Sequence, residues 1–268
     1  MRGVTDDKHY INIAETIREK TGTENTYFPE EMPAGVGEVF EAGKQEGVDE
    51  TKLAIWNALT AYGAREHFTR AFYEGDFTDF TFPKPIKVKG SAGRMFYNYR
   101  GTKLPRKEDI DLSGADVSYT GNDDIYGVNN AFGWASKVTF IPDYGIPAPA
   151  KYYLTYANIG KVIEIEKIRS KETTVWERTF ENARSLTTLQ IEGVIGTSFP
   201  IQYSPLSVAS LKSIIKHLKD YTGTNEYSYT VTFKATAFAE LEAEGATSPN
   251  GNTWAEYIDD LKWNLVKA

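Results

Sequence analysis

Three pairs of carboxylates are the residues whose types and spacing come nearest to a catalytic site. They are Asp109 with Asp111, Asp123 with Asp124, and Asp259 with Asp260. Glycoside hydrolysis needs only two carboxyl groups that flank the scissile bond. The two adjacent pairs point apart on a strand or helix, whereas Asp109 and Asp111 can share one face of a strand. All three pairs lie in polar loop or cap contexts, so turn chemistry or a solvated face explains them better. A hydrolase acting on glycans is kept as a minor alternative.

The sequence holds no other arrangement that is typical of catalysis or of cofactor binding. It contains no cysteine, and its three histidines, His9, His67 and His217, lie in separate segments. Disulfides and thiolate sites are therefore excluded, and a histidine metal site is not expected. The glycine loops of nucleotide-binding proteins and the serine elbow of hydrolases are also absent. We expect no catalytic residue, no metal and no cofactor.

Aromatic side chains are stronger candidates, and for binding rather than catalysis. The chain has 17 Tyr, 14 Phe and 5 Trp, and these rigid rings suit contacts with proteins or sugars. Five of them lie at turns and edges, off the repeating apolar columns of the chain: Trp134, Tyr144, Tyr152, Tyr153 and Trp176. A cluster of exposed rings there would mark a contact surface. The alternative is that irregular insertions fold back and bury these rings.

The elements that must position these rings form a repeat of 24 residues. Phe132, Tyr156 and Phe180 keep this spacing. Three further apolar columns recur in step with them: Ala135, Ile159 and Ala183; Val138, Val162 and Leu186; and Ile141, Ile165 and Leu189. A period of about 20–29 residues is typical of a leucine-rich-repeat solenoid, whose stacked units build an extended surface. We predict that the columns stack inside one core.

The remainder of the repeat region is expected to be irregular. Residues 64–89 are aromatic, and Pro83 and Pro85 bar a long helix there, so we interpret this segment as a cap on the first repeat. Residues 95–105 are a degenerate first repeat, and residues 106–127 are a loose insertion before the three regular copies.

The N-terminal segment, residues 1–62, is predicted to be helical and acidic. It holds twelve acidic and six basic side chains, and so carries −6 of the chain's net charge of −7. Its long second helix, near residues 30–62, is punctuated by glycines and should not be stable alone in water. We expect it to associate with copies of itself or with a neighbour. The alternative is a broken pair of helices packed on their own domain.

The C-terminal segment, residues 206–268, is predicted to be a small α+β cap. Ser207 is placed to cap an amphipathic helix that closes near Gly223. Alternation predicts a strand over 227–233. Two short helices, near 237–244 and 253–261, and a last strand over 263–266 follow. The fold class expected for the whole chain is therefore α+β: a helical N-terminal segment (1–62), a short irregular leucine-rich-repeat solenoid with an aromatic N-terminal cap (63–205), and this cap (206–268).

Charge and hydropathy exclude several classes of partner. A negative chain lacks the basic footprint that nucleic-acid binding requires. No stretch approaches the roughly 18 apolar residues of a membrane span, so no membrane insertion is expected. The first residues contain no apolar h-region, which predicts no secretory signal.

Several segments resemble one family. Residues 5–10 (TDDKHY), 13–22 (IAETIREKTG) and 27–34 (YFPEEMPA) resemble the start of tail-associated proteins in phages and prophages of Gram-positive bacteria. The middle resembles the BspA-type leucine-rich repeats often fused to that start, and residues 206–215 (LSVASLKSII) resemble their usual end. The resemblance implies a segment that attaches to the tail or baseplate and a solenoid that faces the host surface. It implies no catalytic residues.

The leading hypothesis is a virion protein of the tail or baseplate, made in the host cytoplasm, which binds a glycan or protein on the host cell. By resemblance to tail fibres and tips, residues 1–62 would form a homotrimer or dock onto other baseplate proteins. A second hypothesis is a non-phage adhesin or protein-interaction module. The third is a tail-borne glycan hydrolase.

Overall fold

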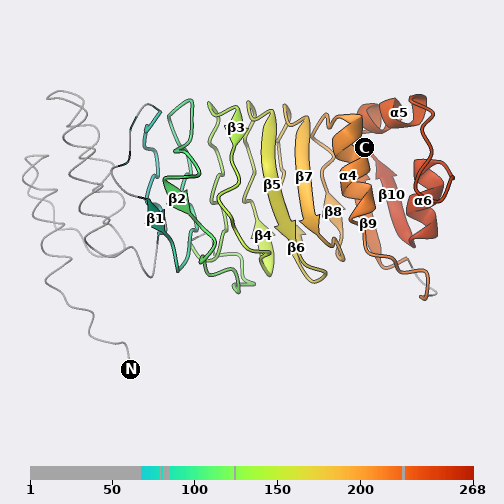
Figure 1. Ribbon diagram of the computed structural model, residues 1–268, viewed down its shortest axis with the longest axis horizontal. Helices are drawn as coiled ribbons and strands as arrows, with labels where there is room; N and C mark the ends of the chain where they lie inside the picture. The colour runs from blue at the N-terminus through green and yellow to red at the C-terminus, as the bar shows by residue number, and fades with distance from the viewer. Residues whose placement is uncertain (1–67, 79, 81, 83–84, 124, 225–226) are drawn as a thin grey trace, which may run out of the picture.

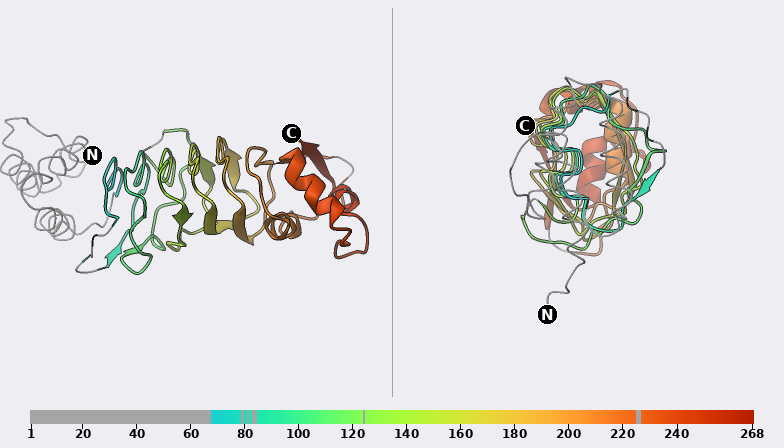
Figure 2. Two further views of the ribbon diagram at one scale, coloured as in Figure 1. Left: turned by 90° about the horizontal axis from the view of Figure 1, so that it is seen from above. Right: turned by 90° about the vertical axis from the view of Figure 1, so that its left-hand side faces the viewer.

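The computed structural model describes residues 68–268 apart from 79, 81, 83–84, 124 and 225–226. The described chain winds through coils that stack along one axis, and it ends in a module of helices and strands (Figure 1). Seen end on, the coils lie behind one another (Figure 2). The mixture of helices with several small parallel sheets confirms the α+β class. The predicted helical segment 1–62 lies outside the described residues.

An aromatic ring at a sharp corner marks the start of each coil. We number the coils 1 to 5, as residues 68–91, 92–127, 128–151, 152–175 and 176–199. Their rings are Phe72, Phe96, Phe132, Tyr156 and Phe180 in that order. Each ring stacks on the next with centroids 5.1 to 5.8 Å apart, in the offset range that aromatic pairs prefer. The aromatic column is therefore one continuous stack through the five coils.

The columns predicted from the sequence form the core. All twelve side chains of the four columns are buried. Short parallel strands keep them aligned: β3 (Phe140–Ile141), β5 (Glu164–Ser170) and β7 (Thr188–Gly193) place Ile141, Ile165 and Leu189 in register. The prediction that these residues stack inside one core is confirmed.

Two further pairs of short parallel strands also join neighbouring coils. β1 (Ile86–Lys87) pairs with β2 (Ile110–Asp111), and β4 (Lys151–Tyr153) pairs with β6 (Val175–Glu177), both in parallel. The strands are two to seven residues long, because each coil bends again before a longer strand can extend.

The corners have an unusual backbone that repeats from coil to coil. The residues two before and two after each ring have a positive φ: Arg70 and Glu74, Arg94 and Asn98, Asn130 and Trp134, Leu154 and Asn158, and Arg178 and Asn182. This left-handed conformation turns alternate amides toward the next coil. The Phe132 N–H donates to the Thr155 carbonyl at 3.0 Å, and corresponding bonds join the other corners of coils 1 to 5. Four of the ten positions are Asn, which tolerates this conformation better than most residues.

The first two coils differ from their prediction. The described part of 68–89 is itself a coil rather than a cap, because Phe72 joins the ring stack and its N–H donates to the Met95 carbonyl at 2.8 Å. The segment 106–127 is only partly loose, because it contains β2. The residues by which coil 2 exceeds the 24-residue period pack back against the coils. The Asp116 N–H, for example, donates to the Gly90 carbonyl at 3.0 Å.

The C-terminal module contains the predicted elements. They are α4 (Val208–Lys216), β9 (Tyr229–Phe233), α5 (Ala235–Ala243), α6 (Trp254–Asp260) and β10 (Trp263–Lys267). Ser207 caps α4 as predicted, but the helix ends at Lys216 rather than near Gly223. A short strand at the end of the coils, β8 (Phe199–Pro200), pairs with β9, which pairs with β10. The sheet of the module therefore continues the stack of coils.

Candidate contact surface

Three of the five aromatic residues predicted to form a contact surface are core residues. Tyr144, Tyr152 and Trp176 are 3%, 0% and 3% exposed. Tyr152 and Trp176 face each other across β4 and β6 with ring centroids 4.8 Å apart. They belong to a further inward column with the same 24-residue period, and burial raises the pKa of the Tyr152 hydroxyl. The assignment of these three residues to a contact surface is therefore wrong.

Buried hydroxyls of this kind need a partner, and both tyrosines find one in the backbone. The Tyr144 hydroxyl donates to the Pro105 carbonyl at 2.5 Å, and the Tyr152 hydroxyl donates to the Arg169 carbonyl at 2.9 Å. These bonds offset the cost of burying the polar end of the ring, which is why two tyrosines fit inside this core.

Trp134 and Tyr153 reach the surface, in different surroundings. Both are half-buried. Tyr153 lies under the ammonium group of Lys151, 5.4 Å from the ring centroid, and Lys151 is itself paired with Glu177 at 2.5 Å. Trp134 instead packs on another aromatic ring, that of Tyr97, at 5.1 Å. Trp134 is therefore the predicted residue that packs against another partly exposed ring.

That cluster is a row of three rings that crosses coils 1 to 3, and we call it the aromatic row: Tyr73, Tyr97 and Trp134. Tyr73 and Tyr97 stack at 5.6 Å with their planes 5° apart. All three side chains are half-buried. Sequence reasoning missed Tyr73 and Tyr97, although their separation of 24 residues repeats the period of the core and was available as a signal.

Polar side chains lie beside the aromatic row. The Arg94 guanidinium lies over the Tyr97 ring at 4.8 Å. Glu74 accepts hydrogen bonds from Asn98 at 3.1 Å and from Arg100 at 2.8 Å. Burial, followed by the charge of Glu74, raises the pKa of the Tyr73 hydroxyl. The hydroxyl, which any tyrosine keeps protonated at neutral pH, is a hydrogen-bond donor here.

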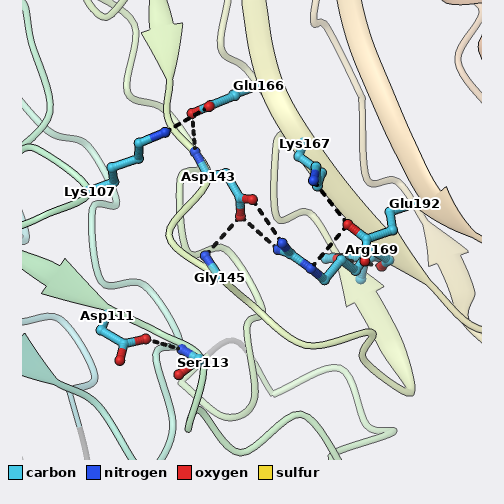
Figure 3. A network of polar contacts seen from close by, with 10 residues as sticks. Lys107, Asp111, Ser113, Asp143, Gly145, Glu166, Lys167, Arg169 and Glu192 are labelled. Atoms are coloured by element: carbon cyan, nitrogen blue, oxygen red, sulfur yellow. Dashed lines mark hydrogen bonds and ion pairs between the residues drawn. The ribbon is translucent and has the colours of Figure 1, made fainter.

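A second polar network crosses the coils along the β3, β5 and β7 strands (Figure 3). Its centre is a bidentate ion pair, in which the two terminal nitrogens of Arg169 donate to the two carboxylate oxygens of Asp143 at 2.7 and 2.8 Å. Glu166 accepts from Lys107 and from the Asp143 N–H, both at 2.9 Å. Glu192 lies 3.1 Å from Lys167 and 3.6 Å from Arg169. The network links coils 2 to 5.

The charges of this network neutralise one another. Burial acts to raise the pKa of Asp143, but hydrogen bonds from Arg169 and the Gly145 N–H outweigh it and hold the pKa below its usual value. Hydrogen bonds from the Asp143 N–H and from Lys107 lower the pKa of Glu166. Since these shifts come from ion pairs within the network, we interpret it as a structural tie between coils.

Four of the carboxylates considered for hydrolysis, Asp109, Asp111, Asp259 and Asp260, bind neighbouring groups. Arg106 holds Asp109 with two bonds of 2.9 Å. Asp111 accepts from the Ser113 N–H at 2.8 Å, and Asp259 accepts from the Tyr227 hydroxyl at 2.7 Å. Asp260 accepts from Asn250 at 2.7 Å. Asp259 and Asp260 make the surface contacts that the sequence contexts predicted, whereas Asp109 is buried, at 4% exposed, and Asp111 lies on β2. Asp124 lies outside the described residues.

The described part of the chain offers no metal site and no membrane-spanning helix. Among the residues placed by the structure, no group of three His, Asp or Glu side chains is arranged to hold a metal ion. No helix in the same residues is both long and apolar enough to cross a membrane. Comparisons with family models, curated proteins and solved structures found no match to the chain.

Proposed function

We propose that this chain is a non-catalytic tail or baseplate protein of a phage of Gram-positive bacteria, which contacts the surface of the host cell. The observation that carries the proposal is the aromatic row of Tyr73, Tyr97 and Trp134, which lies partly exposed across three coils. Rings outside a core that gather in a row are costly to leave against water, and such patches mark contact surfaces.

The coils suit such a contact because they form an extended scaffold. We infer that they are an irregular leucine-rich-repeat solenoid of the BspA type, with residues 206–268 as its terminal cap. The 24-residue period and the continuous ring stack support this inference. Repeats of this kind hold a surface rigidly, because each unit packs on its neighbours. The resemblance of residues 5–34 to the start of phage tail proteins supports the place in the virion.

Binding to whole cells tests the proposed contact. Full-length protein carrying a fluorescent label is added to a panel of Gram-positive strains, and the bound fraction is measured against concentration. We expect saturable binding to at least one strain, which excess unlabelled protein displaces. Binding to every strain alike, or to none, would contradict a specific host contact.

The N-terminal segment 1–62 is proposed to assemble the protein into a trimer. Its acidic, glycine-punctuated helical pattern predicts a partner, and the resemblance to tail fibres favours three copies. Light scattering of the full-length chain is expected to give the mass of three chains at micromolar concentration. A monomeric mass would overturn self-association and leave docking onto another baseplate protein as the role of the segment.

A further inference from the structure

One position recurs at the trailing end of every corner, two residues after each ring. Its occupants are Glu74, Asn98, Trp134, Asn158 and Asn182, and we call them the left-handed row. All five have a φ between +54° and +59°. Asn98 is exposed and the other four are half-buried. The row therefore presents one side chain from each of the five coils, in order along the axis of the stack.

Trp134 is the exceptional member of this row. Three of the other four positions hold Asn, whose short side chain tolerates the left-handed region, whereas a bulky residue there is an outlier. Its φ of +59° carries a conformational cost, and its half-buried ring packs on Tyr97 at 5.1 Å. Strained residues of this kind concentrate at binding sites. Trp134 is the aromatic residue among the corner positions with a positive φ, and its partly exposed indole is therefore the candidate for a binding role in this row.

The neighbours of Trp134 in the row are amides and a carboxylate that bond to one another across coils. On one side, Asn98 donates to Glu74 at 3.1 Å. On the other side, Asn182 donates to Asn158 at 2.9 Å. The Trp134 ring is therefore an aromatic platform, on which a flat apolar face of a ligand can stack. Along the stack it is flanked by side-chain amides that both donate and accept hydrogen bonds.

The backbone N–H groups of the row are already hydrogen-bonded within the protein, which limits the class of ligand that the row can bind. The Asn98, Trp134 and Asn158 N–H groups donate to carbonyls of the following coil at 2.9, 3.0 and 2.6 Å. An extended peptide that binds by strand addition needs free main-chain groups, and these amides are not available to it. Side-chain amides beside an indole face suit a ligand rich in hydroxyl groups with apolar CH faces.

We propose that the left-handed row binds an extended glycan chain, with the Trp134 ring stacked on the CH face of one sugar and Asn98, Asn158 and Asn182 bonded to hydroxyls of its neighbours. Hydrogen-bonded coils lie about 4.8 Å apart, a spacing comparable to the length of one pyranose unit. This inference rests on the proposed contact with the host surface and narrows that contact to a polysaccharide.

Two variants with residues borrowed from neighbouring coils test the proposal. Trp134→Asn installs the residue that coils 2, 4 and 5 carry in the row, and it removes the indole ring together with its contact to Tyr97. Phe140→Thr is the matched control: Phe140 is a 42% exposed ring on β3 of the same coil. Its register partners, Glu164 and then Thr188, show that threonine fits this strand position. Asn182→Gly is a second test that keeps a residue suited to a positive φ and deletes one amide.

The probe is wall polysaccharide from a strain that binds the full-length protein, digested with protease and immobilised on a sensor. We expect the wild-type chain and Phe140→Thr to bind alike, Trp134→Asn to bind at least tenfold more weakly with an unchanged or raised melting temperature, and Asn182→Gly to bind several-fold more weakly. Equal binding by the wild-type chain and both row variants would overturn the assignment of the row.

Other outcomes separate the glycan from the contact itself. If protease treatment of whole cells abolishes binding and the polysaccharide does not bind, the ligand is a protein and the glycan proposal fails, while the host contact stands. If the wild-type chain binds no cells at all, the proposed function fails and the glycan proposal fails with it.

Discussion

Replacing Phe132 with alanine is expected to lower the free energy of unfolding by about 3–5 kcal/mol. The ring is 1% exposed and lies at the middle of the ring stack, 5.4 Å from both Phe96 and Tyr156. Its removal leaves a cavity between two coils, because the backbone ladder of the corner holds them apart. Urea unfolding of the full-length chain, followed by far-UV circular dichroism, measures the change.

The same coil supplies the control for this substitution. Phe140 is also a phenylalanine, but its side chain is 42% exposed, and Phe140→Ala should change stability by less than about 1 kcal/mol, as surface substitutions usually do. A loss at Phe132 as small as that at Phe140 would contradict a core built on the ring stack.

Gly193→Ala is expected to be the second severe substitution, with a loss of roughly 2–5 kcal/mol from backbone strain and overpacking together. Gly193 ends β7 with a φ of +98°, and an added Cβ would lie 1.9 Å from the Ser170 carbonyl oxygen. Ser170 is its register partner on β5. The substitution therefore forces the two strands apart at the end of their sheet.

Gly160→Ala is the matched control for this prediction. An added Cβ at Gly160 meets no atom within 4 Å, and its φ is not among the positive values of the described glycines. A Gly→Ala change at a compatible position is neutral or stabilises by about 0.4–1 kcal/mol. Thermal unfolding of both variants compares them directly. Equal melting temperatures of Gly193→Ala and Gly160→Ala would contradict a close approach of β7 to β5 at Gly193 and Ser170.

The core of the coils could be predicted from the sequence because its columns recur with a fixed period. Phe132, Tyr156 and Phe180 lie 24 residues apart, and each ring occupies the same corner. Coil 1 was missed because its prolines and irregular aromatics suggested a cap. The spacing of 36 residues from Phe96 to Phe132 breaks the 24-residue period that would join coil 2 to the regular copies.

The contact surface was harder to predict, because a tyrosine in a repeat can face either way. Tyr152 lies inward, since its hydroxyl reaches the Arg169 carbonyl, and no pattern in the sequence shows that a partner will be present. Tyr97, directly after the ring of its own coil, is half-buried and packs on Tyr73 and Trp134 instead. The left-handed conformation of Trp134 could not be predicted from its residue type. The asparagines at the same position of other coils, Asn98, Asn158 and Asn182, were the one signal for it.

A titration of labelled full-length protein on cells of a strain that it binds, comparing the wild-type chain with Trp134→Asn and Phe140→Thr, tests the host contact directly. We expect Trp134→Asn to shift the half-saturation concentration upward by at least tenfold, while Phe140→Thr leaves it unchanged and both variants remain at least as stable as the wild-type chain. Identical titration curves for all three proteins would contradict the claim that the corners of the coils contact the host.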